Sequence, residues 1–180
     1  VIPAGYDIAQ DQFVLPVTAD KTVYKTAGPK LTVSEEGNDL KVTSSKVNFV
    51  FDKKAGVVAS YKVGGTEYFN EGFGIQPNFW RAPTDNDYGA KLQHKYAAWK
   101  NPDLRLTSLK HETKEGQVVV SAEYDMRSVS AKLYLTYTIN NRGAVKVNQK
   151  MVADKGKKAS DMFRFGMQLV MPKDFEYVSY

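Results

Sequence analysis

The sequence predicts an all-β fold, an antiparallel sandwich, on the strength of three observations. Apolar and polar residues alternate with a period of two along most of the chain, which is the pattern of strands with one buried face. Val, Thr, Tyr and Phe fill the alternating stretches, and turn signals separate these stretches at short intervals. A chain of 180 residues with 42% hydrophobic content can also bury roughly 70% of its unfolded surface, so it can form a sizeable core without cross-links.

The clearest element is a hairpin at residues 46–63. Val47, Phe49 and Phe51 share one face of its first strand, and residues 52–56 turn the chain back on itself. We therefore expect the second strand to end at the glycine pair that follows it.

A second hairpin is predicted at residues 131–151. The side chains Leu133, Leu135, Tyr137 and Ile139 alternate with more polar residues through 131–140. A turn follows at 140–143, and the alternation resumes at 145–151. The other predicted strands are residues 13–17, 39–43, 104–113, 117–125, 162–171 and 175–180. About ten to twelve short strands with close turns are typical of a sandwich.

Residues 90–100 interrupt the strand pattern. Leu92, Tyr96 and Trp99 stand at positions that share one helical face, and Asn101 followed by Pro102 would end the helix. We therefore expect one short helix near residues 90–100, lying against the sheets.

The composition excludes several classes of function. Cysteine is absent, which removes disulfide scaffolds and thiolate metal sites. The two histidines are far apart in the sequence, so a histidine metal site or a Ser-His-Asp triad has little support.

Charge and hydropathy indicate which partners to expect. The basic residues behind the net charge of +5 are scattered, with their densest run at 155–158 in an expected turn, so we expect no nucleic-acid partner. No apolar run approaches the roughly 20 residues of a bilayer span, so we expect no membrane partner.

The most informative segment is residues 77–89, Pro-Asn-Phe-Trp-Arg-Ala-Pro-Thr-Asp-Asn-Asp-Tyr-Gly, which we call the motif segment. Its prolines restrict the backbone, its Asp and Asn side chains can accept hydrogen bonds from nearby amides, and Gly89 permits a positive φ. We expect an ordered loop that Phe79 and Trp80 anchor in the core or at an interface.

The two aspartates of this segment have three readings. Arg81 can form a bidentate ion pair with Asp85 or Asp87, which is the structural reading. A calcium loop fails, because Gly89 and Tyr96 stand where acidic or amide ligands are needed. A glycosidase carboxylate pair is geometrically conceivable, since residues two apart on an extended chain are roughly 6.5 Å apart, but neighbours on one loop point the same way rather than across a cleft.

Residues 79–89, Phe-Trp-Arg-Ala-Pro-Thr-Asp-Asn-Asp-Tyr-Gly, resemble a motif in the C-terminal, small-chain region of glycoside hydrolase family 2 β-galactosidases. Residues 4–13 resemble the end of the immunoglobulin-like domain that precedes this region. Residues 164–172 resemble the strand leading to the family's Tyr-Gly-Arg-Gly-Pro motif, which itself does not occur before Tyr180.

This resemblance implies a domain organisation. Residues 1–17 would be the tail of the preceding immunoglobulin-like domain, and residues 18–29 would be a linker. Residues 30–180 would be the N-terminal part of a small-chain β-supersandwich, a galactose mutarotase-like fold. Both ends then look cut from a longer polypeptide, and a truncated sandwich leaves open sheet edges that can recruit a second copy.

The resemblance also implies a function. The family comprises large bacterial exo-glycosidases that remove terminal β-D-galactose with retention, using two glutamates on an upstream (β/α)8 barrel. Neither glutamate is expected here, since Glu35 and Glu36 lie in a polar turn before a strand. We expect the chain alone to be inactive, with the barrel, the immunoglobulin-like domain and, through the parent enzyme, a galactoside as its partners. The family's magnesium and sodium ions bind mostly elsewhere, so no cofactor or metal is expected on this chain.

The residues that match the motif carry over only a role in shaping the loop at the substrate rim, and no catalytic residue is assigned. They are Trp80, Arg81, Asp85, Asn86, Asp87 and Gly89. A competing hypothesis is a free-standing carbohydrate-binding module, because 11 Tyr, 9 Phe and 2 Trp could present rings to a sugar, although such residues in a sandwich are mostly core or cross-strand pairs. The compartment stays open between cytoplasm and periplasm.

Overall fold

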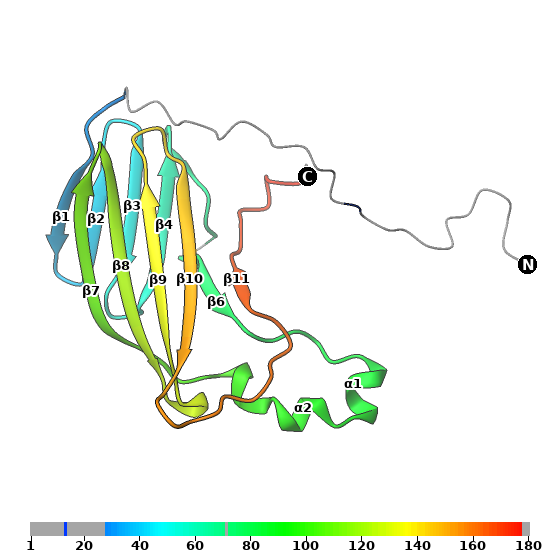
Figure 1. The fold of residues 1–180 in the computed structure, drawn as a ribbon. Coiled ribbons are helices and arrows are strands. Elements are labelled where there is room, and N and C mark those ends of the chain that lie inside the picture. The colour runs from blue at the N-terminus through cyan, green and yellow to red at the C-terminus, as the bar shows by residue number, and fades with distance from the viewer. Residues whose placement is uncertain (1–12, 14–27, 71, 178–180) are drawn as a thin grey trace, which may run out of the picture.

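The computed structural model describes residue 13, residues 28–70 and residues 72–177. In this part of the chain two antiparallel sheets lie face to face, and a short third sheet and several helical turns lie beside them (Figure 1). The predicted all-β sandwich is therefore confirmed. The predictions for residues 1–17 and for the linker at 18–29 lie almost wholly outside the described residues and stay predictions.

The first sheet has five strands in sequence order. They are β1 (Thr32–Glu36), β2 (Asp39–Thr43), β3 (Val47–Asp52), β4 (Val57–Val63) and β5 (Thr66–Glu67). The predicted hairpin is β3 and β4, and its first strand buries Val47, Phe49 and Phe51 on one face as expected. A bulge between Val50 and Phe51 shifts the register, which bends the strand without moving these side chains out of the core.

Strand β1 was not predicted, and the expectation that Glu35 and Glu36 lie in a turn was wrong. Both belong to this edge strand. Glu36 accepts a hydrogen bond from Lys41 Nζ at 2.5 Å and Glu35 from Lys53 Nζ at 3.0 Å. Glutamate disfavours strands, but pairing with β2 overrides local propensity, and charged side chains protect an edge from further pairing.

The second sheet has four strands in the order β10-β9-β8-β7. They are β7 (Leu104–Lys114), β8 (Gln117–Met126), β9 (Ala131–Ile139) and β10 (Val145–Ala153), with the 3-10 turn η2 (Arg127–Val129) between β8 and β9. Every second residue of β9 is buried. These four strands match the predicted ones within a few residues.

Aromatic rings join the two sheets. The Phe49 and Phe51 rings from β3 lie 5.8 and 6.1 Å from the Tyr137 ring of β9, measured between centroids. The Tyr124 hydroxyl of β8 donates a hydrogen bond to the Gly56 carbonyl oxygen at 2.8 Å. Burial raises the pKa of both tyrosines well above the ordinary value, so both hydroxyls stay protonated.

The single helix expected at residues 90–100 is wrong in its boundaries and continuity. Three short turns occur instead: α1 (Asp85–Gly89), α2 (Leu92–Lys95) and η1 (Ala97–Lys100). Lys91 has a φ of 58° between the first two, which no continuous right-handed helix accommodates. Segments this short are not stable as isolated helices, so their conformation depends on packing, above all on the buried Trp99.

The strands predicted at 162–171 and 175–180 were also largely wrong. Only β11 (Gly166–Gln168) forms in the first, and it pairs with β6 (Gln76–Asn78). Residues 175–177 are not in a strand, and residues 178–180 lie outside the described part. Pro77 at the centre of β6 has no N–H to donate, which keeps this sheet short.

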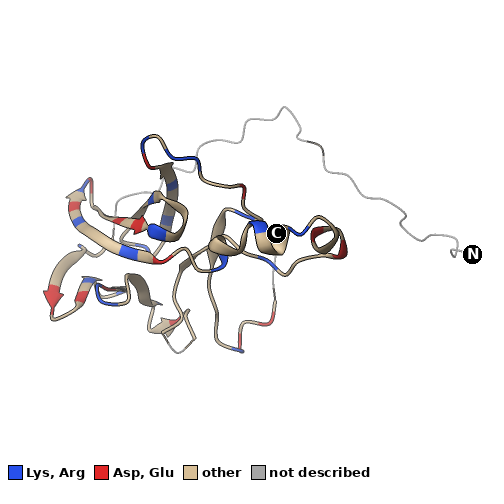
Figure 2. Ribbon diagram, turned by 90° about the horizontal axis from the view of Figure 1, so that it is seen from below, with Lys and Arg blue, Asp and Glu red and all other residues tan. Residues whose placement is uncertain are grey.

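Charged residues are spread over many elements of the described chain, and the basic ones form no continuous stripe (Figure 2). None of the helices in the described residues has the length and apolar character needed to cross a membrane.

Candidate functional site

The motif segment runs from β6 through an extended stretch into α1, beside the two large sheets (Figure 1). It is therefore ordered, as expected, although part is strand and part helix rather than loop. Its geometry depends on two sets of contacts, an ionic network within the segment and an aromatic cluster with residues 160–165.

The ionic network centres on the buried carboxylate of Asp87. Arg81 donates to it twice, from Nη1 to Oδ2 at 2.5 Å and from Nη2 to Oδ1 at 3.2 Å. The Thr84 backbone N–H and hydroxyl also donate to Oδ2, at 2.7 and 3.0 Å. The Asp87 side chain is only 8% exposed. Of the two partners the sequence left open for Arg81, the structure selects Asp87.

The hydrogen bonds from Arg81, and next the Thr84 amide, lower the pKa of Asp87 from 3.8 to about 2. Because the folded-state pKa is depressed, the ionised carboxylate stabilises the fold above about pH 4, and this stabilisation is lost as the pH falls through about 2. We expect urea unfolding at a series of pH values to show a fall in stability across this window. In Asp87→Asn the fall should be smaller.

The matched control for this prediction is Asp85→Asn, on the same helical turn. Asp85 is exposed, and no bond joins it to Arg81 among the described residues, so the variant should follow the wild-type pH dependence. If Asp87→Asn follows the wild type as well, the Arg81–Asp87 pair does not contribute to acid stability.

Aromatic contacts with residues 160–165 and with η1 also hold the motif segment in place. The Trp80 ring meets the Phe163 ring edge-on at 4.8 Å between centroids, and the Arg81 guanidinium lies 4.7 Å from the centroid of the same ring. Phe79 packs against Trp99 at 5.5 Å. These contacts hold the start of the motif segment and η1 together.

The structure separates the six predicted site residues into two groups. Trp80, Arg81 and Asp87 are brought together by the contacts above. Asp85, Asn86 and Gly89 are exposed on α1. Gly89 permits a positive φ but does not adopt one, since it is the last residue of this helical turn. A Cβ placed at Gly89 would meet no atom within 4 Å, so nothing in the described chain requires glycine there.

Three contributors to this site were missed in the sequence. The Phe163 ring meets the Trp80 ring edge-on, Ser160 accepts a hydrogen bond from the Trp99 indole N–H at 2.9 Å, and Gln168 accepts one from Asn78. All three lie far along the chain from the motif. The Phe-Arg-Phe run at 163–165 offers two aromatic side chains for packing, but its alternation predicts a strand instead.

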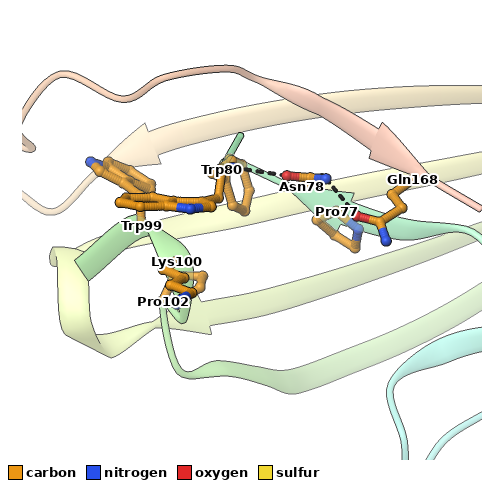
Figure 3. Close-up of a pocket in the computed structure, with 8 residues that line it drawn as sticks. Pro77, Asn78, Trp80, Trp99, Lys100, Pro102 and Gln168 are labelled. Carbon is orange, nitrogen blue, oxygen red and sulfur yellow. Dashed lines mark hydrogen bonds between the residues drawn. The ribbon is translucent and has the colours of Figure 1, made fainter. Parts of the chain in front are cut away.

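A cavity of about 240 Å³, which we call the motif cavity, lies beside these contacts. Pro77, Asn78 and Gln168 line one end, and Trp99, Lys100 and Pro102 line the other (Figure 3). Phe79 and Trp80 complete the lining. The Asn78 side chain is held from both sides, since Nδ2 donates to Gln168 Oε1 at 2.5 Å and Oδ1 accepts from the Trp80 amide at 2.8 Å.

The contacts described above hold the motif segment in one conformation. The lining of the motif cavity contains no Asp or Glu. Asp87 is bound to Arg81 with a lowered pKa, so it cannot serve as a general acid near neutral pH. Within the described residues, no group of three or more His, Cys, Asp or Glu could hold a metal ion. The fold and the site together define a β-sandwich domain with a rigid aromatic and ionic segment at its surface.

Comparison with known proteins identifies the family. Residues 43–180 match the family model described as Beta galactosidase small chain, and the chain belongs to this family. A relative named Beta-galactosidase from Priestia megaterium (strain DSM 319 / IMG 1521) is 39% identical over 151 residues, which cover 82% of this chain and 14% of the relative. Another, from Lactobacillus delbrueckii subsp. bulgaricus, is 30% identical over 174 residues, covering 94% of this chain and 16% of the relative.

A third relative named Beta-galactosidase, from Kluyveromyces lactis, is 36% identical over 106 residues, covering 59% of this chain and 10% of the relative. The chain thus spans about a sixth or less of the length of these relatives. Most of each relative has no counterpart in this sequence.

Proposed function

We propose that this chain is a non-catalytic segment of a β-galactosidase that hydrolyses terminal β-D-galactosides with retention, and that it scaffolds the enzyme and shapes the rim of its active site. The observation that carries the proposal is the division within the motif. Trp80, Arg81 and Asp87 are occupied in fixing its conformation, whereas Asp85 and Asn86 are presented to solvent together on α1. Exposed polar residues on a rigid support are the expected form of a surface that meets another part of an enzyme.

Further support comes from the chemistry absent from this surface. A retaining glycosidase needs two carboxyl groups about 5 Å apart across the substrate, and the motif cavity is lined by none. The proposal therefore assigns catalysis to other parts of the parent enzyme, its barrel above all, and assigns no metal or cofactor to this chain.

The test uses the chain alone and as part of a full enzyme. Nitrophenyl β-galactoside hydrolysis is measured with the isolated chain and with the Priestia megaterium relative in which this chain replaces the region that it matches. The isolated chain should give no hydrolysis and the chimera should hydrolyse the substrate. Activity of the isolated chain at a rate above that of buffer would overturn the non-catalytic assignment.

In that chimera, the double variant Asp85→Ala, Asn86→Ala should lower kcat/KM roughly tenfold, because small misplacements at a substrate rim are costly to catalysis. Its stability should change by less than about 0.5 kcal/mol, since both side chains are exposed. The control Glu112→Ala, an exposed acidic position on β7, should change neither quantity. Unchanged kcat/KM in the double variant would remove these residues from the rim.

Self-association is a second consequence of the proposal. Among the described strands, β5, β7, β10 and both strands of the β6–β11 sheet have a neighbour on one side only, as does β1, whose edge the charged Glu35 and Glu36 protect. Unpaired strand edges recruit other chains. We expect light scattering of the isolated chain to show dimers whose fraction rises with concentration. A monomer throughout the working range would contradict this.

A free-standing carbohydrate-binding module is the second candidate, favoured by Trp80, which lines the motif cavity and is partly exposed. The chimera separates the two candidates, because a free-standing module would not support hydrolysis when built into the relative. Such a module would bind sugar as the isolated chain.

A further inference from the structure

We propose that Phe163 is a positioning residue for the parent enzyme: by holding Arg81 in place, it fixes the helical turn α1, whose exposed side chains lie at the rim of the active site. This inference rests on the proposed rim-shaping function and adds a residue on which that function depends. Phe163 is assigned no contact with substrate, because it acts through Arg81, about eighty residues earlier in the chain.

The Phe163 ring is held in one orientation by two other rings. It belongs to residues 154–165, which join β10 to β11 and form neither helix nor strand. The rings of Trp80 and of Tyr96, between α2 and η1, meet it edge-on at 4.8 and 5.3 Å between centroids. The Arg81 guanidinium lies over the same ring, 4.7 Å from its centroid. An aromatic face that is already oriented is a defined binding surface for a guanidinium group.

Arg81 needs this second contact to keep its geometry. Its side chain is 39% exposed, and an ion pair at such a position holds two side chains together only weakly, because water competes and rotamer freedom is lost. The two bonds from Arg81 to Asp87 also require that the planar guanidinium fork faces the carboxylate. By covering one face of the guanidinium, the Phe163 ring restricts its rotation and keeps the fork directed at Asp87.

Asp87 carries this constraint into α1. Its Oδ2 atom accepts hydrogen bonds from the Thr84 backbone N–H and hydroxyl at 2.7 and 3.0 Å, which forms the capping box of the turn. A helical segment of five residues is not stable by itself, so its direction depends on the capping box and on Arg81. Asp85 and Asn86 lie between the two capping residues and are exposed. Their side chains therefore move with the turn.

The test is a double-mutant cycle in the chimera with the Priestia megaterium relative. Phe163→Leu keeps an apolar side chain but removes the ring face that Arg81 binds, and it should lower kcat/KM about fivefold. In the chimera that already carries Asp85→Ala, Asn86→Ala, the same change should lower kcat/KM by less than about twofold, because the side chains through which Phe163 acts are gone. A merely structural role would give equal losses in both chimeras, and that result would overturn the inference.

Further variants show whether the ring and the guanidinium are what matters. Phe163→Tyr keeps the ring and should bring kcat/KM to within about twofold of the wild type. Arg81→Lys keeps the charge but loses the planar fork, and it should reproduce the effects of Phe163→Leu in both chimeras, which keeps the inference testable if Phe163→Leu does not fold. The control Phe175→Leu makes the same change at a ring that is 40% exposed and packs on Tyr68, and it should leave kcat/KM unchanged.

A second readout uses the 180-residue chain without substrate. The pKa of the Asp87 carboxyl is followed by 13C NMR during an acid titration. In Phe163→Leu this pKa should rise from about 2 towards its ordinary value of 3.8, because Arg81 is less well ordered beside the carboxylate. In Phe163→Tyr it should stay at the wild-type value. An unchanged Asp87 pKa in Phe163→Leu would contradict the link from Phe163 through Arg81.

Failure of this inference can be distinguished from failure of the proposed function. Wild-type kcat/KM in Phe163→Leu, beside a loss in the Asp85→Ala, Asn86→Ala variant, overturns the inference and leaves the rim-shaping role standing. Unchanged kcat/KM in the Asp85→Ala, Asn86→Ala variant contradicts the rim-shaping role and, with it, the inference.

Discussion

Gly74→Ala should destabilise the fold by about 3 kcal/mol or more, the upper range for forcing extra atoms into a packed site. Gly74 is buried, and a Cβ at this position would overlap the carbonyl oxygen of Val58 and lie 2.6 Å from its carbonyl carbon. Val58 belongs to β4 and pairs with Phe51 of β3, so its backbone cannot move away without straining the β3–β4 ladder. The change in the free energy of unfolding can be measured by urea denaturation.

The control is Gly89→Ala, which makes the same chemical change at a helical position with no atom within 4 Å of the new Cβ. Alanine favours helix over glycine by about 1 kcal/mol, so this variant should be as stable as the wild type or slightly more so. Equal urea midpoints for Gly74→Ala and the wild type would mean that the contact between Gly74 and β4 is absent in solution.

Trp99→Ala should cost about 3–5 kcal/mol, the usual range for removing a large buried aromatic side chain. The Trp99 ring is 1% exposed, packs on Phe79, and donates its indole N–H to the Ser160 hydroxyl at 2.9 Å. It therefore joins η1, the motif segment and residues 160–165. Beyond the loss of stability, we expect the chimera carrying this variant to lose activity, because the support of the motif segment is removed.

Two comparison variants separate packing from hydrogen bonding at this position. Trp99→Phe keeps a ring but loses the bond to Ser160, and its loss of stability should be smaller than that of Trp99→Ala. Tyr88→Ala removes an aromatic side chain that is 55% exposed and should cost less than about 0.5 kcal/mol. A Trp99→Ala variant as stable as Tyr88→Ala would contradict the packing of η1 described above.

The strands that were predicted correctly share one property, a long alternation that needs no distant partner to be recognised. In β9 every second residue faces the core, and a one-residue slip would expose the whole buried set. The strands that were predicted wrongly or missed are those with little alternation of apolar and polar residues. Strand β1 carries two glutamates and exists because β2 pairs with it, and β11 is three residues long and depends on β6, far away in the sequence.

In the candidate site, too, contacts between residues close in the sequence could be predicted and distant contacts could not. The motif segment could be recognised because its residues are contiguous, and so could the pairing of Arg81 with a nearby aspartate. That the partner is Asp87 rather than Asp85 follows from the helical turn, which directs the Asp87 carboxylate back towards Thr84 and Arg81. The role of Phe163 could not be found in the sequence, since about eighty residues separate it from Trp80.

The all-β class, the two large hairpins, the family and the motif segment can be predicted from the amino-acid sequence, because they depend on periodicity and on contiguous residues. The identity of the edge strands, the division of the helical turns and the cavity between β6, η1 and β11 emerge only from the packed fold. Short elements are stable only when packed, so their conformation is set by contacts between residues that lie far apart along the chain.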